Sequence, residues 1–266
     1  MEKIKSSVLQ ALIITKNEEP NIQRVLEKLT WLESVVVLDS YSTDSTIEIL
    51  RAFPNVVVEY RAFDSFASQC NYGLSLLHSS WALSLDADYV LTDGFIDELR
   101  QIITEDDKSI TAYNTRFKFL IYGKELLGNN TTPRPVLFRR EKCKYIDDGH
   151  AHRLVIHGDI ALFKNCILHD DRKSLSIWLS NQDRYSIKEG LKLKDAKNAR
   201  SLINKIRRTK VLAPIFVFFY CLFYKRLIFN GWIGWYYTIQ RTMVEMIFAL
   251  RLIEDEKFNK ESINKF

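Results

Sequence analysis

The sequence predicts an α/β fold with a mostly parallel sheet and helices on both faces. Its first hundred residues alternate between short apolar runs of strand length and segments whose apolar residues recur at helical spacing. Strand–helix alternation of this kind is typical of parallel sheets covered by helices. A second observation is the run S-V-V-V-L at residues 34–38, which indicates a strand buried on both faces. From Ser174 onward the pattern is helical to the end.

Strands and helices are expected in turn along this first part. The strands are predicted at residues 8–15, 34–38, 56–59 and 81–85, and the helices at residues 20–29, 42–53, 66–77 and 92–103. Pro20, Ser42 and Thr92 are favourable residues for starting or capping a helix. Short strands at residues 112–119, 136–140, 153–157 and 161–168 then predict a mixed or antiparallel extension of the sheet. We therefore expect an α/β domain at residues 1–172 and a helical region at residues 173–266.

The composition excludes a disordered chain, because 47% of the residues are hydrophobic and 27% are charged. The four cysteines lie far apart and form no C-x-x-C pair, so we expect reduced thiols in a cytosolic protein without a secretory signal. The net charge of +5 is unevenly spread, with nine Lys or Arg against two acidic residues between positions 188 and 210. This imbalance favours an anionic partner, either a membrane or a nucleic acid.

Two carboxylates follow the fourth predicted strand, in the sequence Asp86-Ala87-Asp88. Ligands of parallel sheets bind beyond the carboxyl ends of the strands, where the chain turns and both side chains can reach one point. Mg²⁺ and Mn²⁺ prefer oxygen ligands, and such an ion would bridge to a diphosphate. The pattern therefore favours a divalent metal site at Asp86 and Asp88. The alternative is a pair of solvated carboxylates that cap the following turn.

Polar residues also follow the first two predicted strands. Asp39 ends the second strand in D-S-Y-S-T-D, where a carboxylate can accept hydrogen bonds from a nucleoside base or ribose. In the same segment, Ser42 and Asp44 have an alternative interpretation as helix caps. The segment T-K-N-E at residues 15–18 follows the first strand. A polar loop before a helix would give the same pattern, so this signal alone does not predict a site.

Four segments, taken in order, resemble family 2 glycosyltransferases with the GT-A fold, which is Rossmann-like. They are A-L-I-I-T-K-N-E-E-P-N-I, V-V-V-L-D-S-Y-S-T-D-S-T, F-A-S-Q-C-N-Y-G-L and W-A-L-S-L-D-A-D. More narrowly, they look like bacterial lipopolysaccharide core β-glucosyltransferases. The resemblance runs from about residue 8 to residue 168 and continues more loosely into the C-terminal aromatic helices. The four motifs in this order and spacing are together quite specific.

The resemblance implies an inverting, metal-dependent enzyme that moves a hexose from a nucleotide sugar, expected to be a UDP-sugar. The implied acceptor is a hydroxyl of a lipopolysaccharide core or another glycolipid. Asp86 and Asp88 would hold the metal, Mg²⁺ or Mn²⁺, and the diphosphate, while Asp39 would contact the base or ribose. The other residues expected beside the nucleotide sugar are Thr15, Asn17, Glu18, Ser42, Gln69 and Asn71.

The general base is where this sequence departs from the family. Relatives often carry His-Glu-Arg-Leu after the small strands, and the matching stretch here is A-H-R-L at residues 151–154. The base must take a proton from an acceptor hydroxyl as that hydroxyl attacks the anomeric carbon. We favour Asp148 and then His152, with Asp147 and His150 as further candidates. The histidines have an alternative interpretation as polar packing residues on a hairpin.

His169 precedes two acidic residues at the end of the last predicted strand. In similar enzymes a histidine near this place approaches the metal or the diphosphate, and imidazole suits Mn²⁺ better than Mg²⁺. We therefore count His169 with Asp86 and Asp88 as a metal ligand. A structural histidine at a strand end is the alternative.

The C-terminal region is rich in aromatic residues, since residues 211–250 contain 12 of the 33 in the chain. The apolar stretch at residues 211–224 would extend for roughly 21 Å as a helix, less than a ~30 Å hydrocarbon core. Lys225 and Arg226 follow it, and a basic run precedes it. This favours helices that associate with the inner-leaflet surface, in a peripheral protein at the cytoplasmic face of the inner membrane. The alternative is ordinary packing on the catalytic domain.

Three other functions agree with parts of the sequence. Asp-x-Asp after a strand is also the nucleophile motif of haloacid-dehalogenase-like phosphatases, although their motif usually stands near the start. A polyprenyl-phosphate sugar synthase would share the fold and differ in its acceptor. A non-catalytic module that binds a membrane surface or a nucleic acid would leave the acids at the strand ends unexplained. No nucleic-acid motif is present, so we expect no nucleic-acid partner.

Overall fold

The computed structural model describes residues 3–128, 131–148, 151–194 and 202–263. The chain divides into two compact units. The first consists of Met1–Glu125 with Asn130–Arg172, and the second of Leu126–Asn129 with Lys173–Phe266.

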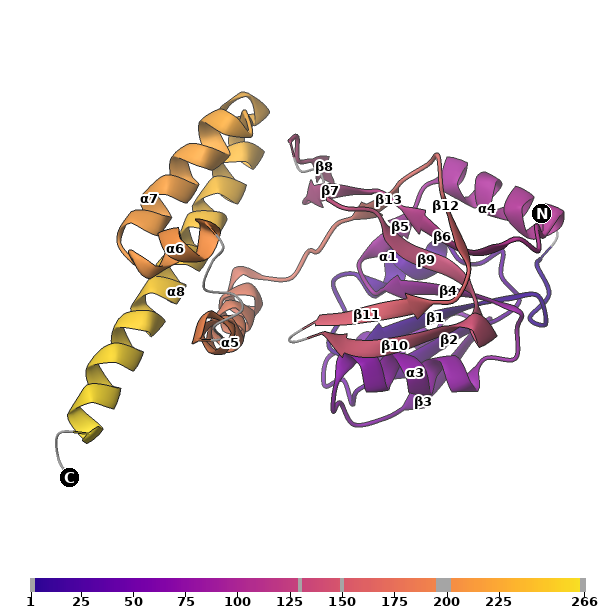
Figure 1. Cartoon of the computed structure of the whole chain (residues 1–266). Helices are drawn as coiled ribbons and strands as arrows, with labels where there is room; N and C mark the ends of the chain where they lie inside the picture. The colour runs from indigo at the N-terminus through magenta and orange to yellow at the C-terminus, as the bar shows by residue number, and fades with distance from the viewer. Residues whose placement is uncertain (1–2, 129–130, 149–150, 195–201, 264–266) are drawn as a thin grey trace. The chain divides into compact units, whose positions relative to one another are not determined.

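A seven-stranded sheet forms the centre of the first unit (Figure 1), in the order β12-β6-β9-β4-β1-β2-β3. Its strands are β1 (Leu9–Thr15), β2 (Val35–Asp39), β3 (Val56–Tyr60), β4 (Trp81–Asp86), β6 (Ile110–Thr115), β9 (Arg134–Arg139) and β12 (Asp159–Leu162). Within this sheet β9 runs antiparallel to both of its neighbours, and the other pairs are parallel. The predicted α/β fold with a mostly parallel sheet is therefore confirmed.

Helices cover both faces of this sheet. They are α1 (Ile22–Glu27), α2 (Thr46–Arg51), α3 (Phe66–Leu76) and α4 (Asp93–Glu105). The first, second and fourth helices share one core with Ile13 and Val37. The third helix shares the opposite core with Leu12 and Val36, together with the hairpin of β10 (Cys143–Asp148) and β11 (Ala151–Ile156). Successive residues of β1 and β2 thus enter opposite layers, as the two-residue period of a strand requires.

The caps explain where two of these helices begin. Thr92 accepts a hydrogen bond from Phe95 N at 3.2 Å and caps α4 as predicted, and Ser65 caps α3 in the same way. The predicted start of the second helix at residue 42 is wrong, because α2 begins at Thr46. Residues 42–44 are engaged instead in bonds to the loop that follows β1.

A second sheet has the order β5-β13-β7-β8. Its strands are β5 (Tyr89–Leu91), β7 (Phe117–Ile121), β8 (Lys124–Glu125) and β13 (Ile167–His169). Residues 112–119 and 161–168 were each expected to form one strand, and this is wrong, because each run is divided between the two sheets. The two crossings lie beside each other, since Ile167 N donates to Arg116 O at 3.1 Å. Polar residues interrupt both runs at the crossings, at residues 114–116 and 164–165, but they do not by themselves reveal a change of sheet.

The second unit is helical, as predicted. Its elements are α5 (Leu175–Lys194), α6 (Leu202–Arg208), α7 (Leu212–Phe219), the π-helical turn η3 (Tyr220–Tyr224), the 3-10 turn η4 (Leu227–Asn230) and α8 (Gly231–Ile263). The buried carboxylate of Glu245 on α8 pairs with Arg207 of α6 at 2.9 Å. Gly234 lies so close to η4 that a Cβ atom there would be 1.9 Å from Leu227 O. Backbone contact therefore holds α8 against η4.

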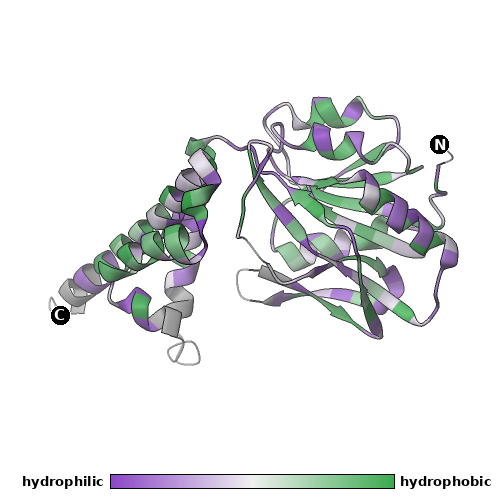
Figure 2. Ribbon diagram, turned by 90° about the horizontal axis from the view of Figure 1, so that it is seen from above, coloured by the Kyte–Doolittle hydropathy of each residue, from purple (hydrophilic) through white to green (hydrophobic). Residues whose placement is uncertain are grey.

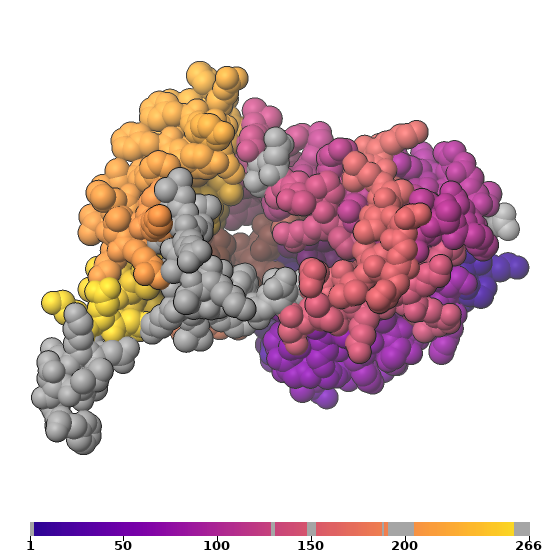
Figure 3. Space-filling view, in the orientation of Figure 1, coloured from indigo at the N-terminus to yellow at the C-terminus, as the bar shows by residue number. Residues whose placement is uncertain are grey.

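Many residues of this unit are hydrophobic (Figure 2), and α7, whose atoms lie at the surface in Figure 3, carries several exposed apolar side chains. Around the bend between η3 and α8, the exposed fractions are 58% for Phe223, 76% for Tyr224 and 82% for Phe229. In the described part of the chain, no single helix is long and apolar enough to cross a bilayer. The pair Leu212–Tyr224 and Leu227–Lys257, bent by 72°, passes a test of length and composition together.

Asn55 provides a test of how the first unit is held together. Its side-chain Nδ2 donates to Leu29 O at 3.0 Å and to Leu32 O at 3.1 Å, and the residue is buried. Asn55→Ala leaves both carbonyls without this donor, so we expect the free energy of unfolding to fall by about 1–3 kcal/mol. Urea denaturation measures this change. Gln101→Ala, which removes an exposed amide on α4, is the control; equal stability of the two variants would contradict the assignment.

Candidate active site

Three neighbouring strands of the large sheet end at one edge (Figure 1), and each ends in a polar residue. Thr15 ends β1, Asp39 ends β2 and Asp86 ends β4. Thr15 stands opposite Asp39 in one parallel ladder, and Ile14 stands opposite Asp86 in the other. Neighbouring strands lie about 4.8 Å apart. The structure therefore brings the three predicted site residues together in one small region.

Asp39 is fully buried at this edge and is held by several donors. Thr15 Oγ1 donates to Asp39 Oδ1 at 2.9 Å, and Ser42 N donates to Asp39 Oδ2 at 2.7 Å. The hydroxyl of Ser42 also donates to Asp39. This carboxylate thus fixes the ends of two strands and the start of the loop that follows β2.

The loops after β1 and β2 are joined by further bonds. Asn17 N donates to Ser42 Oγ at 2.8 Å, and Asn17 Oδ1 accepts from Thr43 N at 2.8 Å. Asn17 has a φ of 56°, a left-handed conformation that Asn tolerates better than most residues. Glu18 N donates to Thr46 Oγ1 at 2.8 Å, at the start of α2. The predicted residues Asn17, Glu18 and Ser42 therefore belong to one loop assembly beside Asp39.

Gln69 and Asn71 lie on α3 and make their hydrogen bonds within the protein. Gln69 is fully buried, and its amide nitrogen Nε2 donates to Ser40 Oγ at 3.0 Å. Asn71 Nδ2 donates to Tyr145 O at 2.8 Å, and Asn71 Oδ1 accepts from Tyr145 N at 2.9 Å. Gln69 thus lies next to the residue that follows Asp39, whereas Asn71 joins α3 to the β10–β11 hairpin.

Asp88 faces His169 across the small sheet. β5 pairs with β13 in an antiparallel ladder that sets Tyr89 opposite His169. His169 Nε2 lies 3.0 Å from Asp88 Oδ2, and the Asp88 side chain is 14% exposed. Asp86, one residue before the buried Ala87, is exposed. The two acids of the D-A-D motif therefore differ in burial, and the histidine predicted as a ligand stands directly beside the more buried one.

The acids act on the protonation of their neighbours. Burial by itself would lower the pKa of His169, but the carboxylates of Asp88, Asp86 and Asp171 raise it above its ordinary value. Burial raises the pKa of Tyr89, and the charges of Asp86 and Asp88 raise it further. These shifts mark the end of β4 as a strongly negative part of the first unit.

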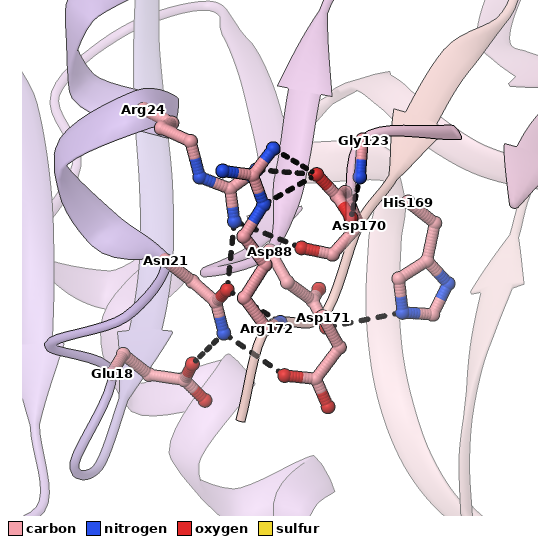
Figure 4. Close-up of polar contacts among 9 residues, drawn as sticks. All are labelled: Glu18, Asn21, Arg24, Asp88, Gly123, His169, Asp170, Asp171 and Arg172. Atoms are coloured by element: carbon pink, nitrogen blue, oxygen red, sulfur yellow. Dashed lines mark hydrogen bonds and ion pairs between the residues drawn. The ribbon is translucent and has the colours of Figure 1, made fainter. Parts of the chain in front are cut away.

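A buried polar network lies on the other side of Asp88 (Figure 4) and centres on Asn21, which is fully buried. Asn21 Nδ2 donates at 3.0 Å both to Glu18 Oε2 and to Asp171 Oδ1. Asn21 Oδ1 accepts from Arg24 Nη2 at 2.8 Å and from Arg172 N at 2.9 Å. All four hydrogen-bonding positions of the Asn21 amide are therefore used.

Asp170 is the buried acid of the same network, with 2% of the residue exposed. Its Oδ2 lies 2.9 Å from Arg24 Nη1 and 2.8 Å from Arg172 Nη2. Its Oδ1 accepts from Gly123 N at 3.1 Å, and its own N donates to Asp88 O at 3.2 Å. One residue therefore connects α1, the turn between β7 and β8, and the segment that carries Asp88.

The candidates for the general base lie on or near the β10–β11 hairpin. Asp147 stands opposite His152 in the antiparallel ladder, and Asp148 stands opposite Ala151. Asp147 Oδ2 accepts from Ser65 Oγ at 3.2 Å. The side chains of Asp148 and His152, and all of His150, lie outside the described part of the structure, so the choice among them stays a prediction.

Several residues of this edge were missed by the sequence analysis. Asn21 and Arg24 look like the exposed side of an ordinary helix start, and nothing in their spacing points to Asp170. The sequence carried only a weak signal for this network. It consisted of an Asn and an Arg three residues apart and of a second acidic residue after His169. Tyr41 was also missed; it has a φ of 58°, is 58% exposed and stacks on Tyr60 with ring centroids 6.1 Å apart. A bulky side chain in that conformation is strained.

The donor types at the end of β4 fit a divalent cation. Asp86 and Asp88 supply carboxylate oxygens, and His169 supplies an imidazole nitrogen, which Mn²⁺ accepts. Among the residues that the structure describes, no three His, Cys, Asp or Glu side chains are grouped as a metal-ligand set. Mg²⁺ bound to a diphosphate needs fewer protein ligands, because one or two carboxylates usually suffice together with phosphate oxygens and waters. The residues present are compatible with a divalent ion that is bound partly by the protein and partly by a diphosphate.

The mostly parallel sheet with helices on both faces agrees with the GT-A type of fold expected from the sequence. The family model for Glycosyl transferase family 2 matches residues 11–161, more than half of the chain. This chain therefore belongs to glycosyl transferase family 2. The resemblance found in the four sequence motifs is thereby confirmed.

Two curated relatives have names that agree with this family, and one solved structure is reported beside them. An uncharacterized glycosyltransferase of Rickettsia bellii is 28% identical over 138 residues, which cover 50% of this chain and 44% of the relative. The lipopolysaccharide core biosynthesis glycosyltransferase LpsC of Rhizobium meliloti is 25% identical over 159 residues, 56% of this chain and 57% of LpsC. The crystal structure of S. aureus TarS 1–349 with UDP-GlcNAc has 13% identity and a TM-score of 0.47, and the superposition covers 96% of this chain and 92% of TarS 1–349. The chain thus spans less than two thirds of either curated relative.

The contacts of Asn71 lead to a prediction about the hairpin. Asn71→Ala removes both bonds to the Tyr145 backbone, so we expect faster amide hydrogen exchange in residues 143–156 and little change in β1 and β2. Hydrogen-exchange mass spectrometry measures this difference. Asn165→Ala, which removes a half-buried amide bonded to Glu98, serves as the matched control. Unchanged exchange of the hairpin in Asn71→Ala would show that other contacts hold it.

Proposed function

We propose that this chain transfers a hexose from a UDP-sugar to a hydroxyl of a lipopolysaccharide-core or other glycolipid acceptor, with inversion at the anomeric carbon. The observation that carries the proposal is the arrangement at the sheet edge, where Asp88 and its partner His169 stand two strands away from the buried Asp39. A diphosphate at Asp88 would leave the nucleoside above the ends of β1 and β2. The relative LpsC, which is named for lipopolysaccharide core biosynthesis, supports the acceptor class.

The proposed cofactor is Mg²⁺ or Mn²⁺, held by Asp86, Asp88 and His169. Such an ion, when bound, neutralises charge that develops on the leaving nucleoside diphosphate. The chain's own part is to supply the ligands at a fixed place. His169 is placed by the β13–β5 ladder, and Asp88 is placed by the same ladder one residue before Tyr89. Placement by strands rather than by a long loop favours a well-ordered ligand pair.

The nucleoside would lie over the loop assembly of Thr15, Asn17, Glu18, Asp39 and Ser42. Since the carboxylate of Asp39 is buried and bonded to Thr15 and Ser42, it acts mainly by holding these loops in shape. Gln69 supports Ser40 from below in the same way. The exposed rings of Tyr41 and Tyr60 offer a flat apolar surface at this edge, on which a nucleobase can stack.

Transfer itself would be a single displacement. An acceptor oxygen forms a bond to the anomeric carbon while the bond from that carbon to the diphosphate oxygen breaks. The acceptor proton passes to a general base, for which Asp148 is proposed first and His152 second. A carboxylate is suited to this step because it is anionic before the reaction and becomes neutral by taking the proton.

We also propose that residues 1–172 form the catalytic domain and residues 173–266 associate with the inner-leaflet surface, as a peripheral protein at the cytoplasmic face. Exposed aromatic side chains at the bend support this proposal, since Phe223, Tyr224 and Phe229 are each more than half exposed. Lys225 and Arg226 stand between them and suit anionic lipid headgroups. A surface-bound enzyme would meet a lipid-linked acceptor while its donor arrives from solution.

The donor site is tested by thermal shift and calorimetry with nucleotide sugars and Mn²⁺. UDP-sugars are expected to raise the melting temperature more than GDP- or dTDP-sugars do. Asp88→Ala should lower the transfer rate by at least about 100-fold, because it removes a carboxylate that would hold the cation needed to neutralise charge on the leaving group. Asp97→Ala, a change of an exposed acid on α4, is the control. A folded, fully active Asp88→Ala enzyme would refute the metal role.

Vesicle sedimentation tests the membrane surface. The triple change Phe223→Ser, Tyr224→Ser and Phe229→Ser should reduce binding to vesicles that contain phosphatidylglycerol by at least about tenfold, because exposed apolar area no longer enters the interface. High salt should weaken the wild-type binding, since basic residues contribute. Phe63→Ser, an exposed aromatic of the first unit, is the control. If the wild-type protein does not bind such vesicles, the proposed location is wrong.

A further inference from the structure

The buried acid Asp170 holds two arginines that belong to different segments. Arg24 comes from α1, and Arg172 follows β13; both side chains reach the same oxygen, Asp170 Oδ2. The Asp170 side chain is 3% exposed, whereas those of Arg24 and Arg172 are 23% and 39% exposed. A single buried carboxylate therefore faces two positive charges at the edge where the proposed cation site lies.

Arg24 is held on more than one side. Its Nη1 donates to Asp170 Oδ2 at 2.9 Å, while its Nη2 donates to Asp170 O at 2.9 Å and to Asn21 Oδ1 at 2.8 Å. A planar guanidinium with several fixed acceptors has little freedom to turn. Figure 4 shows Arg24 and Asn21 approaching the strand end from the side of α1, and His169 from the opposite side.

Besides Asp170, Asp88 is an acid whose charge acts on Arg24. Asp170 N donates to Asp88 O, so the two acids belong to adjacent backbone positions of neighbouring chain segments. Burial lowers the pKa of Arg24, while the carboxylates of Asp170 and Asp88 both raise it. Arg24 therefore lies within the electrostatic reach of Asp88. A guanidinium that turned to Asp88 would form a strong charge-assisted pair and compete with any cation there.

We propose that Asp170 is a positioning residue that keeps Arg24 away from Asp88, with Asn21 fixing the guanidinium from the other side. The carboxylate of Asp88 then stays directed to His169 and to a divalent cation. This inference rests on the proposed function, in which Asp88 binds the metal. Asp170 does not contact the metal or the donor. It acts by pairing with the positively charged guanidinium of Arg24 next to the site.

The experiment compares Mn²⁺ affinity in matched variants, by calorimetry in the presence of UDP and by electron paramagnetic resonance of free Mn²⁺. Asp170→Asn keeps the shape of the side chain and an acceptor for Gly123 N, and it removes the charge that holds Arg24. We expect its dissociation constant for Mn²⁺ to rise at least tenfold. Adding Arg24→Gln to Asp170→Asn should restore the affinity to within about threefold of wild type, because the freed positive charge is gone.

A purely structural role for Asp170 predicts the opposite result for the pair. The double variant would then bind Mn²⁺ no better than Asp170→Asn does, and this outcome would overturn the inference. Arg24→Gln alone keeps wild-type Mn²⁺ affinity under the inference, and a tenfold loss in that variant would also overturn it. Thermal melting accompanies each measurement, and if Asp170→Asn does not fold, the Arg24→Gln comparison decides alone.

Asp88→Ala separates this inference from the proposed function. If Asp88→Ala binds Mn²⁺ as tightly as wild type, the metal site is misassigned and the proposed function fails together with the inference. If Asp88→Ala loses Mn²⁺ binding while Asp170→Asn keeps it, the metal site stands and the role of Asp170 is refuted.

Discussion

The antiparallel pairing of β5 with β13 is the contact on which the candidate site depends. It joins two three-residue strands and brings His169 to Asp88 across 81 positions of sequence. Both residues sit next to a sheet edge rather than in a long loop, so their separation is set by ladder geometry. The same pairing extends by one bond, from Asp170 N to Asp88 O, and so attaches the buried charge network to the acid pair. Without it, the D-A-D motif would be two acids at the end of a strand.

The charge network beside this pairing is costly to bury, and most of its polar groups are accordingly paired. Asn21 uses all four of its hydrogen-bonding positions, and the carboxylate of Asp170 has bonds to Arg24, Arg172 and Gly123. Buried ion pairs contribute little net stability compared with apolar residues of the same size, but they fix geometry when every group has a partner. The network therefore fixes the positions of its side chains more than it stabilises the fold.

The sequence predicted the large sheet well, because its strands and helices have clear periods. The apolar run from Ser34 to Leu38 predicts only a strand. The helical spacing of Phe95, Leu99 and Ile103 predicts only a helix. The small sheet was not predicted, since β5 has only three residues and the polar residues 114–116 at the crossing do not by themselves show that the chain changes sheet. Asp39 and Asp88 could be found as acids that follow strands. Asn21, Arg24 and Asp170 could not, because their meaning lies in contacts between segments about 146 to 151 positions apart.

The contact between Gly234 and the carbonyl of Leu227 has a mechanical consequence for the second unit. Two backbones touch there, and no side chain lies between them that could rotate to absorb a displacement. Both residues lie in the second of the two helical segments that meet at 72°, so the contact fixes how η4 joins α8. η4, which carries the exposed ring of Phe229, is therefore expected to move with α8 as one body. A larger residue at position 234 would loosen that coupling.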